Sequence, residues 1–147
     1  MARAVPLFSG SKGNSYYIGS ASEGVLIDAG RSCKQIENAM LANGLDMGSI
    51  GAVFITHEHT DHCSALRVLA KRYGFKVYSS LGTLNALRAG NKLDPNTDAD
   101  VITDEVVIGN MRVQRIDTPT MRRKACCYRV TAPDGNPTLI ATTIWAF

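Results

Sequence analysis

Short apolar runs alternate with amphipathic segments along the first part of the chain. Residues 5–8 and 16–18 are largely apolar or aromatic and enclose the small polar run 9–15, which predicts a β-hairpin. A short strand is predicted at residues 25–27. The continuous β-branched and apolar run 50–56 predicts a strand buried on both faces, and residues 75–78 predict a further strand.

The spacing of apolar positions predicts three helices among these strands. Ser32 and Gln35 form a capping box that begins the first helix, and Gly44 ends it. Apolar residues of the second helix recur at the helical spacing up to Gly74. The third helix spans residues 81–89. The apolar positions of the second helix are Leu66, Leu69, Ala70 and Tyr73.

The second half of the chain changes to strands without intervening helices. Residues 91–104 are polar and predict a loop. Two hairpins are then predicted, one from residues 105–108 and 111–116, the other from residues 127–131 and 138–141. Strands that first alternate with helices and then pair as hairpins predict a mixed α/β fold with at least one large sheet. A length of 147 residues predicts one domain over the whole chain, residues 1–147.

Composition narrows the class of protein. Hydrophobic residues make up 45% and charged residues 20%, as in a globular domain, and 16 Lys and Arg against 13 Asp and Glu give a net charge of only +3. No apolar run approaches the roughly 20 residues of a membrane span, so we expect no membrane partner. The first residues lack a secretory pattern, and the four cysteines form no C-x-x-C pair. We therefore expect free thiols and a cytoplasmic location.

All three histidines of the chain fall between His57 and His62. In an extended segment that leaves a strand, His57 and His59 project to the same side, while Asp61 and His62 turn back at the start of the next helix. Imidazole and carboxylate groups share one small volume at low cost when a cation balances them. The spacing predicts a metal site for zinc, manganese or iron.

Three motifs resemble the metallo-β-lactamase superfamily. The strand and H-x-H-x-D-H loop of that family match residues 54–62, which read FITHEHTDH, and its upstream Asp motif matches LIDAG at residues 26–30. The opening SGSKGNS at residues 9–15 resembles a subgroup of bacterial metallo-hydrolases regarded as possible nucleases, distantly similar to ribonuclease Z.

The resemblance implies an αββα sandwich with a two-metal site, of which this chain would be roughly the N-terminal half to two-thirds. It assigns His57 and His59 to the first metal and Asp61 and His62 to the second. It also implies that Asp28 lies behind the loop and orients it, and that Asp61 takes a catalytic part by orienting a metal-activated hydroxide. The implied reaction is hydrolysis of a phosphodiester or acyl centre.

Two positions depart from the family pattern. A stretch that reads T-P-H-D in the subgroup is TPTM here, so Thr120 stands where the family has histidine. The A-T-D segment that supplies a bridging aspartate reads ATT, which places Thr143 at that position, and a last histidine is also missing. Zinc, of which the family binds two ions, is therefore expected here as one ion or none.

Both departures can come from one kind of event, a frameshift. Loss of one base before codons for His-Asp-Ala-Ala-Glu yields Thr-Met-Arg-Arg-Lys, the sequence at residues 120–124, and a similar loss yields residues 143–147. We hypothesise that the C-terminal part is a frameshifted, truncated form of a complete hydrolase, which the nucleotide sequence of the gene would test. Sheet edges exposed by the missing part predict self-association.

Three functions follow from the sequence. The first is a metal-dependent hydrolase that acts on nucleic acid or another phosphodiester. The alternative is a catalytically incomplete fragment that only binds metal. A third is plain nucleic-acid binding by a modest basic cluster, which consists of Arg112, Arg115, Arg122, Arg123, Lys124 and Arg129.

Overall fold

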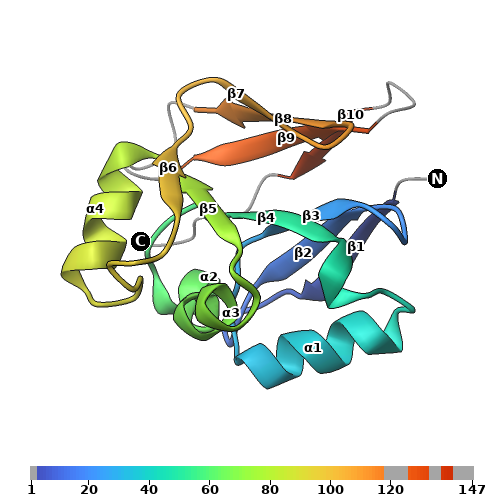
Figure 1. Cartoon of the computed structure of the whole chain (residues 1–147), viewed down its shortest axis with the longest axis horizontal. Coiled ribbons are helices and arrows are strands. Elements are labelled where there is room, and N and C mark those ends of the chain that lie inside the picture. Colours follow the sequence, from blue (N-terminus) through green and yellow to red (C-terminus); the bar gives the residue numbers. More distant parts are fainter. Residues whose placement is uncertain (1–2, 118–125, 133–136, 141–147) are drawn as a thin grey trace.

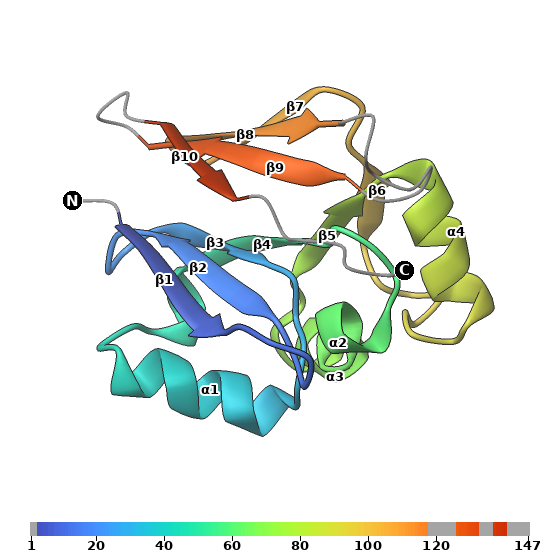
Figure 2. The same cartoon turned by 180° about the vertical axis from the view of Figure 1, so that it is seen from behind.

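Two β-sheets lie face to face, and helices cover the outer side of the larger sheet (Figures 1 and 2). The structure is a computed structural model that describes residues 3–117, 126–132 and 137–140. Within those ranges no helix covers the outer side of the smaller sheet, so three layers of the predicted αββα sandwich are present. No helix in the described part of the chain is long and apolar enough to cross a bilayer.

The larger sheet has six strands in the order β1-β2-β3-β4-β5-β6. The pairs β1–β2 and β2–β3 are antiparallel, whereas β3 to β6 run parallel to one another. Parallel neighbours bring their carboxyl ends to one edge of the sheet, where ligand and catalytic sites commonly form. The strands are β1 Arg3–Phe8, β2 Ser15–Gly19, β3 Gly24–Ile27, β4 Ile50–Phe54, β5 Lys76–Ser79 and β6 Ala99–Val101.

The smaller sheet is fully antiparallel, in the order β10-β9-β8-β7. Both predicted hairpins are confirmed as the pairs β7–β8 and β9–β10, although residue 141 lies outside the described residues. The edge strands of the two sheets are β1, β6, β7 and β10, and self-association through them stays a prediction for sedimentation to test. The strands are β7 Glu105–Ile108, β8 Met111–Ile116, β9 Cys127–Thr131 and β10 Pro137–Ile140.

The predicted capping residues are confirmed at the start of the first helix and at the end of the second predicted helix. Ser32 accepts a hydrogen bond from the Gln35 backbone, and the complete capping box is present. Gly74 closes the second predicted helix in a left-handed conformation, as expected of a C-terminal glycine. The helices are α1 Cys33–Ala42, the 3-10 turn η1 Met47–Ser49, α2 Thr60–Cys63, α3 Leu66–Tyr73 and α4 Leu81–Ala89.

The apolar run of β4 is explained by two cores, one on each face of the larger sheet. Val53 and Ile55 belong to the core beneath helices α1 and α3, and Phe54 belongs to the core between the sheets. There its ring stacks on Tyr78 at 5.0 Å and meets Tyr128 edge-on at 5.3 Å. The carboxyl end of β4 is therefore packed on both faces of the sheet.

Two strand predictions need correction. β4 ends at Phe54 rather than residue 56, and its Gly51 is exposed, so burial on both faces does not hold along its whole length. The predicted loop 91–104 contains β6, a half-exposed strand of three residues that pairs with β5. Long-range hydrogen bonds hold β6, including Val77 N–H to the Asp98 carbonyl and Ile102 N–H to the Ser79 carbonyl, and three residues are too few to show a strand pattern in the sequence.

Candidate metal centre

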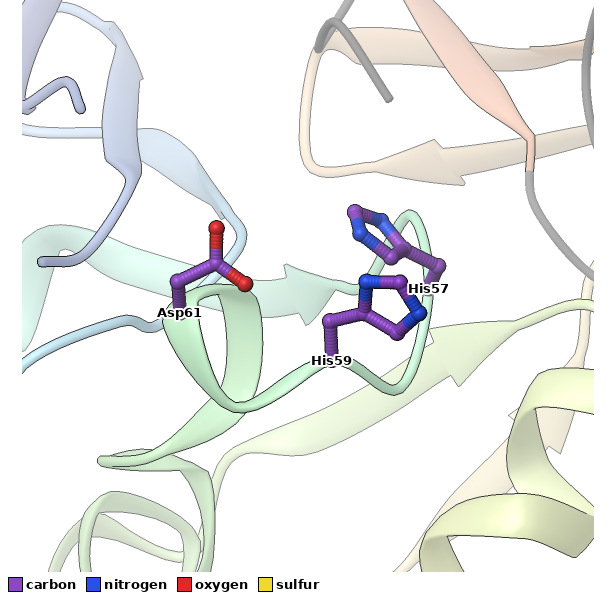
Figure 3. Close-up of side chains that lie close together, drawn as sticks. All are labelled: His57, His59 and Asp61. Atoms are coloured by element: carbon purple, nitrogen blue, oxygen red, sulfur yellow. The ribbon is translucent and has the colours of Figure 1, made fainter. Parts of the chain in front are cut away.

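The segment between β4 and α3 brings the predicted ligands together. His57, His59 and Asp61 each offer one ligand atom, and these atoms lie within 4.8 Å of one another. Figure 3 shows the three side chains on one side of the loop. The ring centre of His62 lies 4.0 Å from that of His57, so the fourth predicted residue joins the same cluster. His57 and His62 are buried, while His59 and Asp61 are partly exposed.

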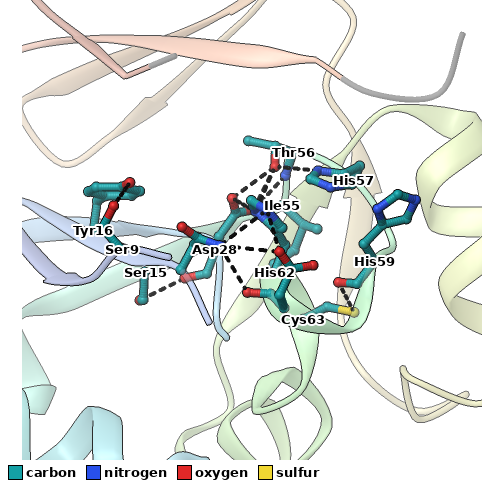
Figure 4. A network of polar contacts seen from close by, with 12 residues as sticks. Ser9, Ser15, Tyr16, Asp28, Ile55, Thr56, His57, His59, His62 and Cys63 are labelled. Carbon is teal, nitrogen blue, oxygen red and sulfur yellow. Dashed lines mark hydrogen bonds and ion pairs between the residues drawn. The ribbon is translucent and has the colours of Figure 1, made fainter. Parts of the chain in front are cut away.

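Asp28 lies behind this cluster at the end of β3, with no exposed surface. Its Oδ2 atom is 2.6 Å from Nδ1 of His62, and its Oδ1 accepts from the backbone N–H of Thr56 at 2.7 Å (Figure 4). With Nδ1–H of His62 donating to Asp28, the His62 ring presents Nε2 to the cluster. Asp28 has a φ of 62°, a left-handed conformation that Asp tolerates better than most residues.

Thr56 links Asp28 to the other buried histidine. Its Oγ1 lies 2.8 Å from Oδ2 of Asp28 and 3.0 Å from Nδ1 of His57. With the hydroxyl hydrogen donated to Asp28, Thr56 accepts from Nδ1–H of His57, which turns Nε2 of His57 toward the cluster. From the sequence, Thr56 is predicted only as a strand residue, although its position between a buried strand and the first histidine is a signal for a supporting role.

Burial and charge shape the titration of the buried pair. Burial raises the pKa of the Asp28 carboxyl, against the opposing effect of its hydrogen bonds to His62 and Thr56. Burial alone would lower the pKa of His62, but its hydrogen bond to Asp28 and the charges of Asp28 and Asp61 outweigh this and raise it.

Both sheets hold the strand end that precedes His57. The carbonyl of Ile55 accepts from the Tyr128 hydroxyl and from Ser79 Oγ, each at 2.6 Å. The backbone N–H of Cys126 donates to the Thr56 carbonyl at 3.0 Å. These bonds join β4, β5 and the β9 segment, so the start of the histidine loop is fixed from two sheets.

Two other loops contact the histidine loop through its backbone. Asn14, between β1 and β2, donates its N–H to the Asp61 carbonyl at 2.7 Å. Lys92, between α4 and β6, donates from Nζ to the Glu58 carbonyl at 2.7 Å. The path of the chain through His57 to His62 is therefore set by partners distant in sequence.

The positions that depart from the family pattern, and part of the basic cluster, cannot be compared with the structure. Thr120 and Thr143 lie outside the described residues, and so do Arg122, Arg123 and Lys124 of the basic cluster. Within the described ranges, Arg112 pairs with Glu105 at 3.5 Å and Arg115 with Asp117 at 3.1 Å. Of the three described arginines of that cluster, two thus have local acidic partners and the third, Arg129, is exposed.

Relatives of known name share part of this sequence. Exodeoxyribonuclease YycJ of Bacillus anthracis is 40% identical over 81 residues, which are 55% of this chain and 31% of that protein. Exodeoxyribonuclease WalJ of Streptococcus pneumoniae is 38% identical over 81 residues, 55% of this chain and 30% of that protein. The aligned segment thus spans about a third of the length of these relatives.

Solved structures share the fold at lower identity. A metallo-beta-lactamase of Cronobacter sakazakii with a HARLDQ motif superposes with a TM-score of 0.76 at 23% identity, over 92% of this chain and 59% of that one. The metallo-beta-lactamase GOB-18 of Elizabethkingia meningoseptica gives a TM-score of 0.74 at 20% identity, over 90% and 57% of the two chains. The family model described as the metallo-beta-lactamase superfamily matches residues 9–135. With this match over most of its length and the sheets and histidine loop described above, the chain belongs to the metallo-β-lactamase superfamily.

Proposed function

We propose that this protein is a metal-dependent phosphodiesterase whose substrate is DNA, with His57, His59, Asp61 and His62 as its metal ligands. The observation that carries the proposal is the convergence of His57, His59 and Asp61, whose ligand atoms lie within 4.8 Å of one another. Such a group of nitrogen and oxygen donors is typical of catalytic metal sites in hydrolases.

The donor set fits a divalent cation of the zinc, manganese or iron type. Asp28 and Thr56 turn the Nε2 atoms of His62 and His57 toward the cluster, as outer partners of metal ligands commonly do. The nearby thiol of Cys63 does not compete as a ligand, because it donates to the carbonyls of Glu58 and His59 at 3.2 Å. Burial also raises its pKa to about 11, which keeps it protonated.

A bound cation would supply a hydroxide from water at neutral pH and stabilise negative charge on the phosphate. The residues of the chain prepare this chemistry. The carboxylate of Asp61, about a third exposed, would accept a hydrogen bond from the attacking water and orient it. The buried Asp28 holds the proton on Nδ1 of His62 and so keeps Nε2 available.

DNA is proposed as the substrate because the two curated relatives described above are named exodeoxyribonucleases. A reducing compartment that contains DNA, the cytoplasm, fits the same proposal, since all four cysteines are free and buried. The basic residues of β8 add little to it, because Arg112 and Arg115 already have acidic partners.

The test is degradation of end-labelled linear DNA by the purified chain with Zn²⁺ or Mn²⁺. We expect turnover that a chelator abolishes, that His59→Ala reduces to background, and that the exposed α1 variant Lys34→Ala leaves unchanged. DNA degradation that survives both the chelator and His59→Ala would contradict the proposal. Stoichiometric zinc binding without turnover would instead support the alternative of a fragment that only binds metal.

A further inference from the structure

The loop between β1 and β2 packs against the candidate metal centre through Asn14. Its backbone N–H donates to the Asp61 carbonyl at 2.7 Å, and its carbonyl accepts from the N–H of Gly30 at 2.9 Å. Asn14 therefore sits between the chain segment that follows β3 and the helix α2 that carries Asp61.

Close packing of glycines fixes this position. A Cβ atom added to Gly30 would lie 2.2 Å from the Asp61 carbonyl oxygen and 2.4 Å from the Asn14 nitrogen. A Cβ added to Gly13 would lie 2.8 Å from the Arg31 nitrogen. Because these distances involve backbone atoms, the three segments approach as closely as glycine allows, and the Asn14 side chain starts from a well-defined place.

Two hydrogen bonds orient the carboxamide of Asn14. Oδ1 accepts from the backbone N–H of Gly10 at 3.1 Å, and Nδ2 donates to the Gly10 carbonyl at 2.9 Å. This pairing distinguishes the two ends of the amide, since only one orientation satisfies both partners. The second hydrogen on Nδ2 is left to point at the metal centre.

Two ligand atoms lie in reach of that hydrogen. Nδ2 is 3.4 Å from Oδ2 of Asp61 and 3.3 Å from Nε2 of His62. Oδ2 of Asp61 accepts this hydrogen, because a carboxylate oxygen has lone pairs to spare, whereas the one lone pair on Nε2 of His62 is the one that would bind a cation. Asn14 thus places one hydrogen-bond donor between Asp61 and His62.

We propose that Asn14 is a positioning residue of the metal centre, which holds the Asp61 carboxylate beside His62 through its side-chain amide. This inference rests on the proposed function. Asp61 is about a third exposed, and Asn14 and His62 supply its described side-chain contacts. Without the amide the carboxylate would adopt other rotamers, and a cation would have to order it on binding.

The test is a Co²⁺ titration followed by visible absorption, with wild type, Asn14→Ala and Asn14→Ser. Serine retains an acceptor for Gly10 N–H but is too short to reach Asp61, so it separates loop support from donation to the ligand. We expect both variants to bind Co²⁺ roughly tenfold more weakly, with an altered absorption band, since loss of outer partners costs metal sites about that much.

The matched control is Asn43→Ala. Asn43 also donates from Nδ2 to a backbone carbonyl, that of Ala39 at 2.7 Å, but at the end of α1. We expect Co²⁺ affinity and spectrum unchanged in this variant. An Asn14 variant that retains the native circular dichroism spectrum and binds Co²⁺ with wild-type affinity would overturn this inference. The proposed function would still stand. Failure of the wild-type protein to bind Co²⁺ would overturn the proposed function and this inference with it.

Discussion

The Nδ1 atom of His62 lies 2.6 Å from Oδ2 of Asp28, in a place where the two side chains are 4% and 0% exposed. The pair joins the end of β3 to the helix α2, 34 residues later. A buried pair of this kind is costly to break, because removing one partner leaves the other desolvated without compensation. The pair therefore fixes both the position of α2 and the face that His62 presents to the metal centre.

Asp28→Asn is expected to reverse the tautomer of His62. An amide nitrogen facing Nδ1 cannot accept its proton, so the proton moves to Nε2, which then cannot bind a cation. We expect zinc affinity to fall by roughly 10- to 100-fold, measured by competition with a chromophoric chelator. The control is Asp46→Asn, whose exposed carboxylate caps η1 through Gly48 N–H. Equal losses in the two variants would argue against a specific role of Asp28.

Sequence patterns predicted the elements whose contacts are between residues close together in the chain. Helix α3 spans the predicted residues because its apolar spacing and Gly74 lie within one segment, and the histidine loop converges because its ligands are adjacent. β6 was missed because its hydrogen bonds to β5 connect segments about twenty residues apart. Asn14 was read only as a turn residue, since its contacts with Asp61 and His62 exist only once β1, β3 and β4 have assembled.

Zinc is expected to stabilise the folded chain. A ligand held only by the native state raises the free energy of unfolding by about 2.7 kcal/mol at one hundred times its dissociation constant. Urea unfolding with and without zinc measures this difference, which should vanish in His59→Ala because that variant lacks a ligand. Mg²⁺ serves as a control, since it binds poorly to imidazole. An equal zinc effect in His59→Ala would place the bound ion elsewhere.

Tyr128→Phe is expected to lower stability by about 1 kcal/mol, the usual net value of a hydrogen bond. The Tyr128 hydroxyl donates to the Ile55 carbonyl at 2.6 Å and is fully buried. Ser79 still donates to that carbonyl in the variant, which limits the loss. Chemical denaturation measures the change in the free energy of unfolding, with Tyr16→Phe as the control. The Tyr16 hydroxyl bonds Ser9 at an exposed site, so we expect this variant to lose almost no stability. A larger effect of Tyr16→Phe would refute this ranking.

Alkaline pH is expected to destabilise the protein through its buried thiols. Burial raises the pKa of Cys126 from 9.0 to about 11. The unfolded thiol therefore loses its proton first, so this contribution is fully present below pH 9 and is lost as pH rises toward 11. The loss is on the order of 2 kcal/mol. Under reducing conditions, the free energy of unfolding should fall less steeply with pH in Cys126→Ser than in the wild type over this interval. Equal declines in the two proteins would contradict the assignment of this effect to Cys126.

Gly30→Ala is expected to disrupt the metal centre without touching a ligand. The φ angle of Gly30 lies outside the left-handed region, so space rather than backbone conformation demands glycine here. The added methyl group would lie 2.2 Å from the Asp61 carbonyl oxygen and 2.4 Å from the Asn14 nitrogen. Neither atom can rotate away, and relief requires α2 and the β1–β2 loop to separate.

We expect a loss of stability of about 3 kcal/mol or more, in the range of severe overpacking, and weaker zinc binding, because Asp61 and His62 move with α2. Gly48→Ala is the matched control, since the atoms nearest to its new methyl group would be side-chain atoms of Asp46, at 3.5 Å and beyond. Thermal unfolding and zinc titration of the two variants measure both effects. Should Gly30→Ala unfold and bind zinc like Gly48→Ala, the close contact of the three segments would not be what holds the ligands in place.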